Sequence, residues 1–288
     1  METTFNKKEK TEAVLAGIKN LPSIPKVVFE VTKLLNDSKT PTNQLAEIIS
    51  KDQGLTSKIL AVANSPLYGI KRKVSSIEFA ILVLGFQDIR NIVTALSLAD
   101  SIKTAPSKFF DPYEFWLHSM VVGTAAKGIS LNFGFDFGSE AFVAGILHDI
   151  GILVIYKFFN PEFNQIIDII NSEKISMLEA EKKALGITHQ EIGKFLSEKW
   201  ELPYILCDSL NYHHRPMKTL ENKYFVSIIH LVDYMTQKLG VGNFYWDKDF
   251  ELDPGIIELL NFPSEEALDN FIADYDEMFR VTAESLKI

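Results

Sequence analysis

Residues 141–156 read Ala-Phe-Val-Ala-Gly-Ile-Leu-His-Asp-Ile-Gly-Ile-Leu-Val-Ile-Tyr, which is the most apolar stretch of the chain. Seven apolar or glycine residues precede the pair His148-Asp149, and seven more follow it. A helix that is apolar on nearly every side is a buried helix. A carboxylate placed in its middle is costly unless it is paired or coordinates a metal. The stretch therefore predicts a buried helix whose histidine and aspartate have polar partners elsewhere in the chain.

Partners of the right kind occur on four other predicted helices. They are His118, His189, His213, His214 and Asp233. With His148 and Asp149 they run along the chain in the order His, His-Asp, His, His-His, Asp. Imidazole together with carboxylate suits Fe, Mn, Zn or Ni, and the ligand types do not distinguish among these metals. Seven ligands are too many for one ion, so the set predicts two divalent metal ions bridged by Asp149.

The positions of these residues on their helices agree with this interpretation. His118 shares the core-facing side of its predicted helix with Phe115 and Val122. His189 falls in the first turn of a helix that Thr188 is expected to cap. Both imidazoles should therefore point inward, toward the His-Asp pair.

A purely structural role is the alternative. A lone histidine such as His118 is usually a core residue with its hydrogen bonds satisfied, and a buried His-Asp pair can be an ion pair with Lys or Arg. The basic residues nearest to the pair in sequence, Lys127 and Lys157, are remote from it, which favours metal. His230, three residues before Asp233, is interpreted as a supporting or surface residue.

The helix start and stop signals along the chain predict an all-α fold. Four segments begin with the pattern of a capping box, namely Ser75–Glu78, Asp111–Glu114, Ser176–Glu179 and Thr188–Glu191. Helices are expected to stop at Gly85, Gly186 and Gly240. No convincing run of alternating strand residues occurs. The stretch 150–156 is the one place where a strand is conceivable, and its long helical flanks argue against it.

Three units are expected along the chain. They are an N-terminal helical subdomain (1–105), a metal-site helical bundle (106–240) and an acidic C-terminal helical extension (241–288). Ala105-Pro106-Ser107 is interpreted as the connector between the first two. Residues 1–105 carry a net charge of +4, residues 106–246 carry −4 and residues 247–288 carry −9. In the extension, Ser264 is expected to cap a last amphipathic helix that packs on the protein through Leu268, Ile272 and Phe279.

Composition excludes several classes of protein. The chain has 288 residues, of which 47% are hydrophobic, and this excludes disorder across its whole length. A single cysteine, Cys207, excludes an internal disulfide framework and fits a cytoplasmic, reducing environment. No uninterrupted apolar run reaches the ~18 residues of a membrane span, so no membrane is expected. The net charge of −9 makes nucleic-acid binding unlikely, and Lys71-Arg72-Lys73 is interpreted as a solvated loop.

The order of the candidate ligands resembles the HD superfamily of metal-dependent phosphohydrolases, whose signature is His…His-Asp…Asp. The matching residues are His118, His148, Asp149 and Asp233. The additional histidines His189, His213 and His214 resemble those of the two-metal HD-GYP branch. The sequence around them is similar as well, in Gly145–Gly151, in Thr188–Gly193 and in Tyr212–Pro216.

The first unit is similar to the HDOD family. Its Leu-Pro-x-Leu-Pro opening is matched by Leu-Pro-Ser-Ile-Pro at 21–25. Further matches are Ile48–Asp52, Leu55–Leu60, Ala63–Pro66 and Leu84–Phe86, so that the resemblance covers residues 20–240. The resemblance implies an all-helical bacterial signalling protein with an N-terminal subdomain and an HD-like bundle. It also implies a protein partner, or a nucleotide or phosphoester ligand.

Two departures from the relatives leave two functions open. Many HDOD domains have lost metal ligands, whereas every ligand position is present in this chain, which favours a phosphohydrolase or a cyclic-dinucleotide phosphodiesterase. Active HD-GYP enzymes carry a lysine three residues after the motif aspartate, where this chain has Ile152, and their Gly-Tyr-Pro segment is missing. This favours a regulatory output module that keeps its metal. Arg215 is the one candidate for a phosphate contact in place of the lysine, although a solvated arginine is the commoner case.

Overall fold

The computed structural model describes residues 4–18, 23–35, 40–241 and 250–287, and these residues form helices and connecting turns without any strand. The all-α prediction is confirmed, and the stretch 150–156 lies in a helix. The helices are α1 (Thr4–Gly17), α2 (Lys26–Leu35), α3 (Thr42–Ser50), α4 (Gln53–Asn64), α5 (Ile77–Asp100), α6 (Pro112–Asn132), α7 (Gly138–Leu147), α8 (Ile150–Phe158), α9 (Asn160–Glu173), α10 (Met177–Leu185), α11 (His189–Lys199), α12 (Tyr204–Tyr212), α13 (Lys223–Lys238), α14 (Gly255–Leu259), α15 (Glu265–Asp274) and α16 (Asp276–Leu286), with short 3-10 turns η1 (Pro66–Tyr68) and η2 (Pro216–Lys218). Part of the 21–25 motif (21–22) and of the predicted C-terminal extension (242–249) lies outside the described residues.

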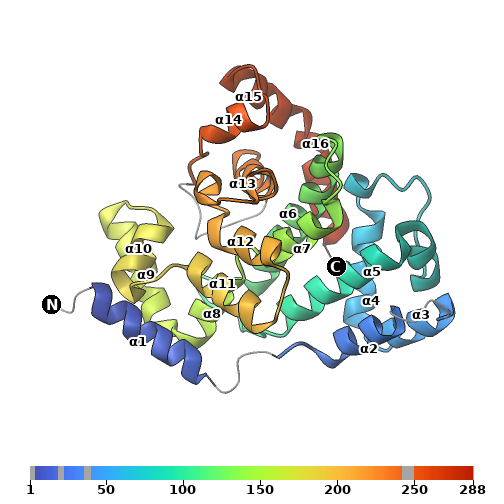
Figure 1. Ribbon diagram of the computed structural model, residues 1–288, viewed down its shortest axis with the longest axis horizontal. Coiled ribbons are helices and arrows are strands. Elements are labelled where there is room, and N and C mark those ends of the chain that lie inside the picture. Colours follow the sequence, from blue (N-terminus) through green and yellow to red (C-terminus); the bar gives the residue numbers. More distant parts are fainter. Residues whose placement is uncertain (1–3, 19–22, 36–39, 242–249, 288) are drawn as a thin grey trace.

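The helices form two neighbouring groups with α6 and α7 at their centre (Figure 1). Helices α2 to α5 lie on one side, and α8 to α13 lie on the other. The first helix, α1, packs against α10, where the hydroxyl of Thr11 donates a hydrogen bond to Leu185 O at 2.8 Å. Residues 103–107 form an irregular connection between α5 and α6. The division of the chain at residues 105 and 240 stays a prediction.

The predicted helix starts are largely confirmed. Complete capping boxes form at Ser176 and at Thr188. Asp111 caps α6 by accepting the N–H of Tyr113 at 2.8 Å, and Pro112 follows it as the first helical residue. The box predicted at Ser75 is wrong by one residue, because α5 begins at Ile77 and Ser76 caps it by accepting the N–H of Phe79 at 3.2 Å.

The three predicted helix stops are confirmed. Gly186 ends α10 in the left-handed conformation, with φ of 78°, and Gly240 follows α13 with φ of 62°. Gly85, with φ of 83° and ψ of 166°, leaves the helical conformation, and α5 consists of two helical segments that meet at a kink there, so this stop is confirmed as well. Each of these positions has the positive φ that glycine adopts more readily than other residues.

The apolar stretch 141–156 is buried along its whole length, as predicted. It is not one continuous helix, however, because α7 ends at Leu147 and α8 begins at Ile150. Asp149 leaves the helical conformation with φ of −97° and ψ of 10°. In an unbroken helix Gly145 O accepts the N–H of residue 149, and in this chain Gly145 O bonds to the ring of His148 at 2.7 Å. The His-Asp pair thus lies at a junction between helices, where both side chains can turn inward.

Two glycines permit unusually close packing around this junction. A Cβ atom on Gly145 would lie 2.5 Å from the Cα of Gly123 on α6. A Cβ on Gly151 would lie 2.0 Å from His189 O at the start of α11. Such distances are sterically forbidden, so only glycine allows α7 to touch α6 and α8 to touch α11. The second contact places His189 beside the His-Asp junction.

The C-terminal extension is helical and packed, as predicted, but it is not a single helix. Ser264 caps α15 by accepting the N–H of Ala267 at 3.1 Å. The helix breaks at Tyr275, and α16 returns toward α4 and α6. The hydroxyl of Thr282 on α16 lies 3.3 Å from that of Ser65, which follows α4. The extension therefore connects the two helical groups.

Two helical stretches, α5 and residues 138–158, are long and apolar enough to cross a membrane by length and composition alone. In the second stretch 89% of the apolar window is buried inside the protein, and in α5 the share is 39%. Core helices of soluble domains meet the same criteria, so these stretches are weak evidence for a membrane-spanning role.

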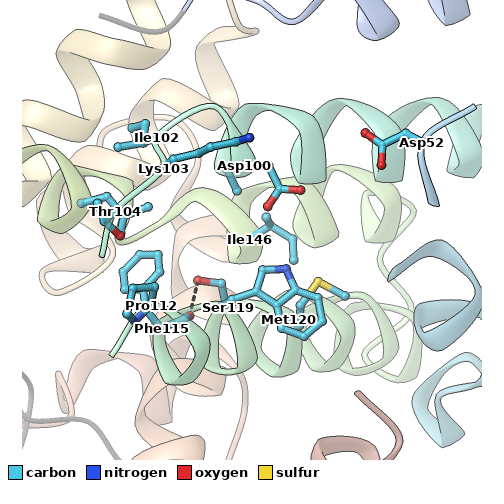
Figure 2. A pocket seen from close by; sticks show the side chains of 13 residues that line it. Asp52, Asp100, Ile102, Lys103, Thr104, Pro112, Phe115, Ser119, Met120 and Ile146 are labelled. Atoms are coloured by element: carbon cyan, nitrogen blue, oxygen red, sulfur yellow. Dashed lines mark hydrogen bonds between the residues drawn. The ribbon is translucent and has the colours of Figure 1, made fainter. Parts of the chain in front are cut away.

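The described residues also line a cavity of about 490 Å³ that is partly open to solvent. It lies between the end of α5, the first half of α6, and the α7–α8 segment (Figure 2).

The close approach of α6 and α7 leads to a stability prediction. Substitution of Gly145 by Ala places a methyl group against the backbone of Gly123, so we expect the free energy of unfolding to fall by about 1–3 kcal/mol. Gly193→Ala in α11 is the matched control, because its Cβ meets no atom closer than 3.6 Å. Alanine is the better helix former, so the control should be neutral or stabilising. Urea unfolding of both variants measures the difference, and equal stabilities would contradict the close packing.

Candidate metal centre

The structure brings all seven predicted ligands together at the meeting point of α6, the α7–α8 junction, α11, α12 and α13. They form two groups, one of Asp149, His189, His213 and His214 and one of His118, His148 and Asp233. Within each group the candidate ligand atoms lie within 4.8 Å of one another. Six of the seven side chains are buried, and His214 is half-buried. Residues separated by more than 100 positions in sequence therefore converge on one small volume.

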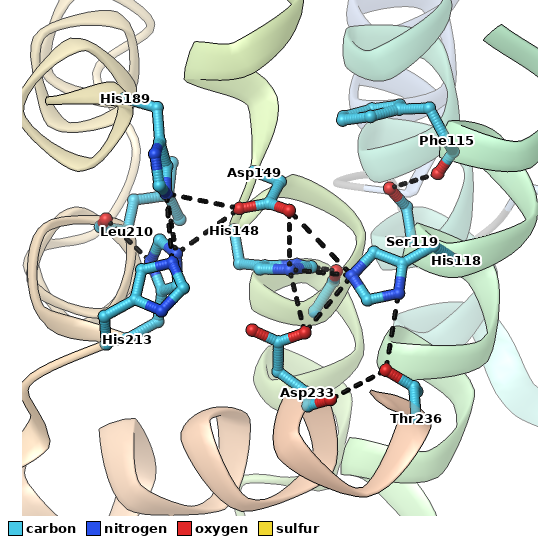
Figure 3. A network of polar contacts seen from close by, with 12 residues as sticks. Phe115, His118, Ser119, His148, Asp149, His189, Leu210, His213, Asp233 and Thr236 are labelled. Carbon is cyan, nitrogen blue, oxygen red and sulfur yellow. Dashed lines mark hydrogen bonds and ion pairs between the residues drawn. The ribbon is translucent and has the colours of Figure 1, made fainter. Parts of the chain in front are cut away.

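Asp149 lies between the two groups (Figure 3). Its Oδ1 atom is 3.4 Å from the Nε2 atom of His189 and 3.4 Å from that of His213. Its Oδ2 atom is 3.4 Å from Nε2 of His148 and 3.9 Å from Nε2 of His118. Each carboxylate oxygen thus faces one group, which is the orientation that a bridging ligand needs.

The other ring nitrogen of His148 and of His213 is fixed by a backbone acceptor. Nδ1 of His148 lies 2.7 Å from Gly145 O, and Nδ1 of His213 lies 3.0 Å from Leu210 O. Since a carbonyl oxygen can only accept, each Nδ1 must carry the hydrogen and donate it. In the neutral rings, Nε2 therefore presents a lone pair to the centre. This is the tautomer that a metal-binding histidine requires.

His118 follows the same rule through a longer contact. The hydroxyl of Thr236 donates to the backbone oxygen of Asp233 at 2.7 Å, so its oxygen is left to accept. Nδ1 of His118 lies 3.5 Å from that oxygen. The Nε2 lone pair of His118 then also points to the centre, 3.2 Å from Nε2 of His148.

The centre is consequently crowded with electron-pair acceptors. Nε2 of His189 lies 3.3 Å from Nε2 of His213 and 3.1 Å from Nε2 of His214. In the part of the chain that the structure describes, no hydrogen bond reaches the buried carboxylate oxygens of Asp149 or Asp233. Buried acceptors that face one another are unfavourable without a positive charge between them. Two nitrogens bound at ~2.1 Å to one tetrahedral ion lie ~3.4 Å apart, so the observed spacing fits a metal.

A structural ion pair with Lys or Arg does not explain the carboxylates. Among the described residues, the ion-pair partners of Asp149 and Asp233 are all histidines. Lys127 instead pairs with Asp88, and Lys157 is exposed on α8. The donor set therefore fits divalent metal better than it fits an ordinary buried salt bridge.

The two groups differ in their electrostatics. Burial lowers the pKa of His148, but the charges of Asp149 and Asp233 outweigh it and raise this pKa to about 10. Burial lowers the pKa of His213, and it lowers that of His214 well below its usual value. The group that contains His148 thus attracts positive charge strongly, while the group that contains His213 and His214 offers neutral imidazoles.

Sequence analysis missed Glu181, which holds His189 in place. Its buried carboxylate accepts the backbone N–H of His189 at 2.9 Å and the ring Nδ1–H at 2.9 Å. Such carboxylate partners fix the tautomer of a ligating histidine and increase its basicity. The signal was present in the sequence, because Glu181 interrupts the apolar stripe of α10 that runs through Met177, Ala180 and Ala184.

His230 is a supporting residue and not a surface residue. Its Nδ1–H donates to His213 O at 2.7 Å, and its Nε2 accepts the N–H of Asp253 at 2.8 Å. Both bonds require a neutral ring, and burial lowers its pKa to about 4. Phe250 packs on the rings of His214 and His230, with centroids 4.8 and 4.9 Å apart. Residues 250–253 therefore cover the half-buried side of the centre.

Neither of the two residues considered for phosphate chemistry belongs to the two ligand groups. Arg215 is exposed, and its role as a phosphate contact stays a prediction. Ile152, where HD-GYP enzymes carry lysine, is 1% exposed and belongs to the apolar core.

Comparison with known proteins finds one matching family and several solved structures with a similar fold. The family model of the HDOD domain matches residues 21–216. A solved HDOD domain protein with unknown function from Geobacter sulfurreducens superposes with a TM-score of 0.77 at 26% identity, covering 99% of this chain and 100% of the other. A Marinobacter aquaeolei VT8 protein whose name proposes signal transduction has a TM-score of 0.71 at 18% identity, covering 99% and 66%. A Shewanella amazonensis SB2B protein whose name proposes a phosphohydrolase has a TM-score of 0.70 at 21% identity, covering 95% and 98%.

A curated relative from Treponema pallidum (strain Nichols), itself uncharacterized, is 20% identical over 214 residues. The match covers 74% of this chain and 41% of that protein, so the chain spans about two fifths of the relative's length. The two structural neighbours below 25% identity establish the shared fold alone.

The raised pKa of His148 makes the metal-free protein sensitive to pH. Its folded-state pKa of about 10 exceeds the unfolded value of ~6.5, so its contribution to stability is complete below pH ~6.5 and is lost as pH rises through about 10. With excess EDTA, we expect the unfolding free energies of wild type and His148→Gln to converge between pH 7 and 9.5, by up to about 1.4 kcal/mol per pH unit. Urea unfolding at several pH values measures this difference. Parallel curves would contradict a protonated His148.

Glu181 is expected to strengthen the group that contains His189. Replacement by Gln removes the charge that orients the ring, so affinity for Zn²⁺ in that group should fall about 10–100-fold. Glu179→Gln is the control, since Glu179 is exposed on the same helix and glutamine can keep its capping role. Competition with a chromophoric chelator measures both affinities. Equal loss in the two variants would mean that the effect comes from α10 and not from the contact to His189.

Proposed function

This chain belongs to the HDOD domain family, and on that premise we propose that it is a bacterial signal-transduction protein, acting as an output or regulatory module that keeps a metal site of two ions. The observation that carries this proposal is the pair of ligand groups that share Asp149 between them. Buried acceptors in this arrangement need a positive charge, which two divalent cations supply.

Each ion would be held by one group and by one oxygen of the bridge. His118, His148 and Asp233 would bind the first, and His189, His213 and His214 would bind the second. Two such ions, when bound ~3.5–4 Å apart, can activate water and clamp a phosphoryl group. Fe, Mn, Zn and Ni all suit these ligands.

The alternative is a metal-dependent phosphohydrolase or a cyclic-dinucleotide phosphodiesterase. The complete ligand set supports it, and so does the name of one structural neighbour, although that name concerns the neighbour. Ile152 argues against hydrolysis, because a buried isoleucine cannot donate a hydrogen bond to phosphate. Arg215 is exposed and outside the ligand groups. These differences from HD-GYP enzymes favour regulation over turnover.

The setting proposed for this activity is the cytoplasm. Cys207 is a free, buried thiol, which fits a reducing compartment. A protein partner in a signalling pathway is the main expectation, with a nucleotide or phosphoester as a second ligand class. Membrane and nucleic-acid binding are not part of the proposal.

Metal counting tests the proposal directly. We expect wild type purified without chelators, or reconstituted, to hold about two divalent ions per chain by elemental analysis. Asp149→Ala removes the bridge and should weaken both sites, whereas Asp233→Ala and His213→Ala should each weaken one. Asp208→Asn is the control, because Asp208 is buried but belongs to neither group. Less than about one ion per chain in wild type would overturn the proposal.

The same preparations separate the two functions. If the protein is regulatory, the fully metallated chain should not hydrolyse bis(p-nitrophenyl) phosphate or a cyclic dinucleotide in the presence of Mn²⁺ or Fe²⁺. Turnover that His148→Ala abolishes would instead establish the enzymatic alternative.

A further inference from the structure

The cavity between α5 and α6 has the size and lining of a small-molecule site. Its volume of about 490 Å³ falls within the ~300–1,000 Å³ of typical ligand pockets. Its apolar lining includes Ile102, Phe115, Met120 and Ile146 (Figure 2). The cavity is partly open to solvent, so a ligand can enter it and displace water from the apolar part of its lining.

One buried polar group in the lining has no partner of its own. The indole Nε1 of Trp116 is inaccessible to solvent and makes no hydrogen bond within the described part of the chain. An indole N–H can only donate, and leaving it unpaired costs about 1–3 kcal/mol. A small rotation of the Trp116 ring toward the cavity would let an acceptor on a bound ligand reach Nε1 and remove this cost.

The acidic residues at the cavity are already engaged by the protein. Asp100 forms an ion pair with Lys58, and Asp52 accepts the N–H of Leu55 at 3.0 Å as the cap of α4. The ammonium of Lys58 also lies 5.1 Å from the centre of the Trp116 ring. The position where a ligand cation would be attracted is thus taken by a side chain of the protein itself.

Donors that remain available lie at the rim. Lys103 is exposed and forms no ion pair with any described residue, and Thr104 beside it adds a hydroxyl group. With Trp116, these residues offer donors at the edge of an apolar chamber. We propose that this cavity binds a small organic anion, whose apolar body fills the chamber and whose carboxylate, sulfonate or phosphate group meets Lys103 and accepts from Trp116.

A ligand in this position would touch both helical groups. Asp52 and Lys103 belong to the N-terminal side, Ser119 and Ile146 lie on the central helices α6 and α7, and Leu153 lies on α8. Ser119 directly follows His118, and Ile146 is two residues before His148. The proposal concerns binding alone and does not depend on the metal centre being occupied or active.

The probe for this test is 8-anilinonaphthalene-1-sulfonate, which combines aromatic rings with one sulfonate. We expect the folded full-length chain to bind one molecule, as measured by fluorescence titration and calorimetry. Trp116→Phe removes the N–H while keeping an aromatic ring, and Lys103→Met removes the charge, so each should weaken binding about tenfold. Lys71→Met, an exposed lysine away from the cavity, is the matched control and should bind as wild type does.

A third variant guards against a folding defect in Trp116→Phe. Ala99 lines the cavity and is half-buried, so Ala99→Trp should fill the chamber and abolish binding. Circular dichroism confirms that each variant is folded. Unchanged affinity in Lys103→Met and Ala99→Trp would overturn the proposal. So would equal binding of the cationic counterpart 1-naphthyltrimethylammonium, because it would show that the site does not select an anion.

Discussion

The arrangement of the described helices depends on one constraint: the electron-pair acceptors that gather where five helical segments meet require a positive charge between them. Imidazole lone pairs and two carboxylates face one another there, and six of the seven side chains are buried. Hydrogen bonds to Nδ1 fix the orientation of the rings: Gly145 O accepts from His148, and Glu181 accepts from His189. Since each of these acceptors takes the Nδ1 hydrogen, the rings cannot satisfy the carboxylates with neutral N–H groups. The raised pKa of His148 has the same origin, because a proton is the smallest cation that the site can take up.

Close backbone packing is what allows the ligands to converge. A His-Asp pair inside an unbroken helix would direct its two side chains about 100° apart. The chain instead breaks the helix at Asp149, so that both side chains enter the same centre. Gly151 then lets α8 approach the backbone of His189, and no larger residue could do so. Fold and site are therefore determined by the same few residues.

The sequence predicted the features that depend on local chemistry. His118 lies on an apolar helical face and Thr188 begins a capping box, and each signal is complete within a few residues. The features that it did not predict depend on contacts between distant segments. The break at Asp149 arises from bonds that replace the helical ladder, and Phe250 reaches His214 from another part of the chain. Glu181 is an intermediate case. The sequence shows a carboxylate within the apolar stripe of its helix, but it does not show that His189 is the partner of that carboxylate.

Access to the centre bears on the function proposed for it. Of the seven ligands, His214 alone is not fully buried, and Phe250 packs against its ring. The ring of His230 accepts the backbone N–H of Asp253 and donates to the backbone oxygen of His213. The C-terminal extension is therefore hydrogen-bonded, through His230, to the segment that carries two of the ligands. An enzyme that acts on phosphate esters needs an open position and a cationic group beside its metals. A centre whose half-buried side is covered by residues 250–253, and where Ile152 takes the place of a lysine, supports the regulatory function proposed above over hydrolysis.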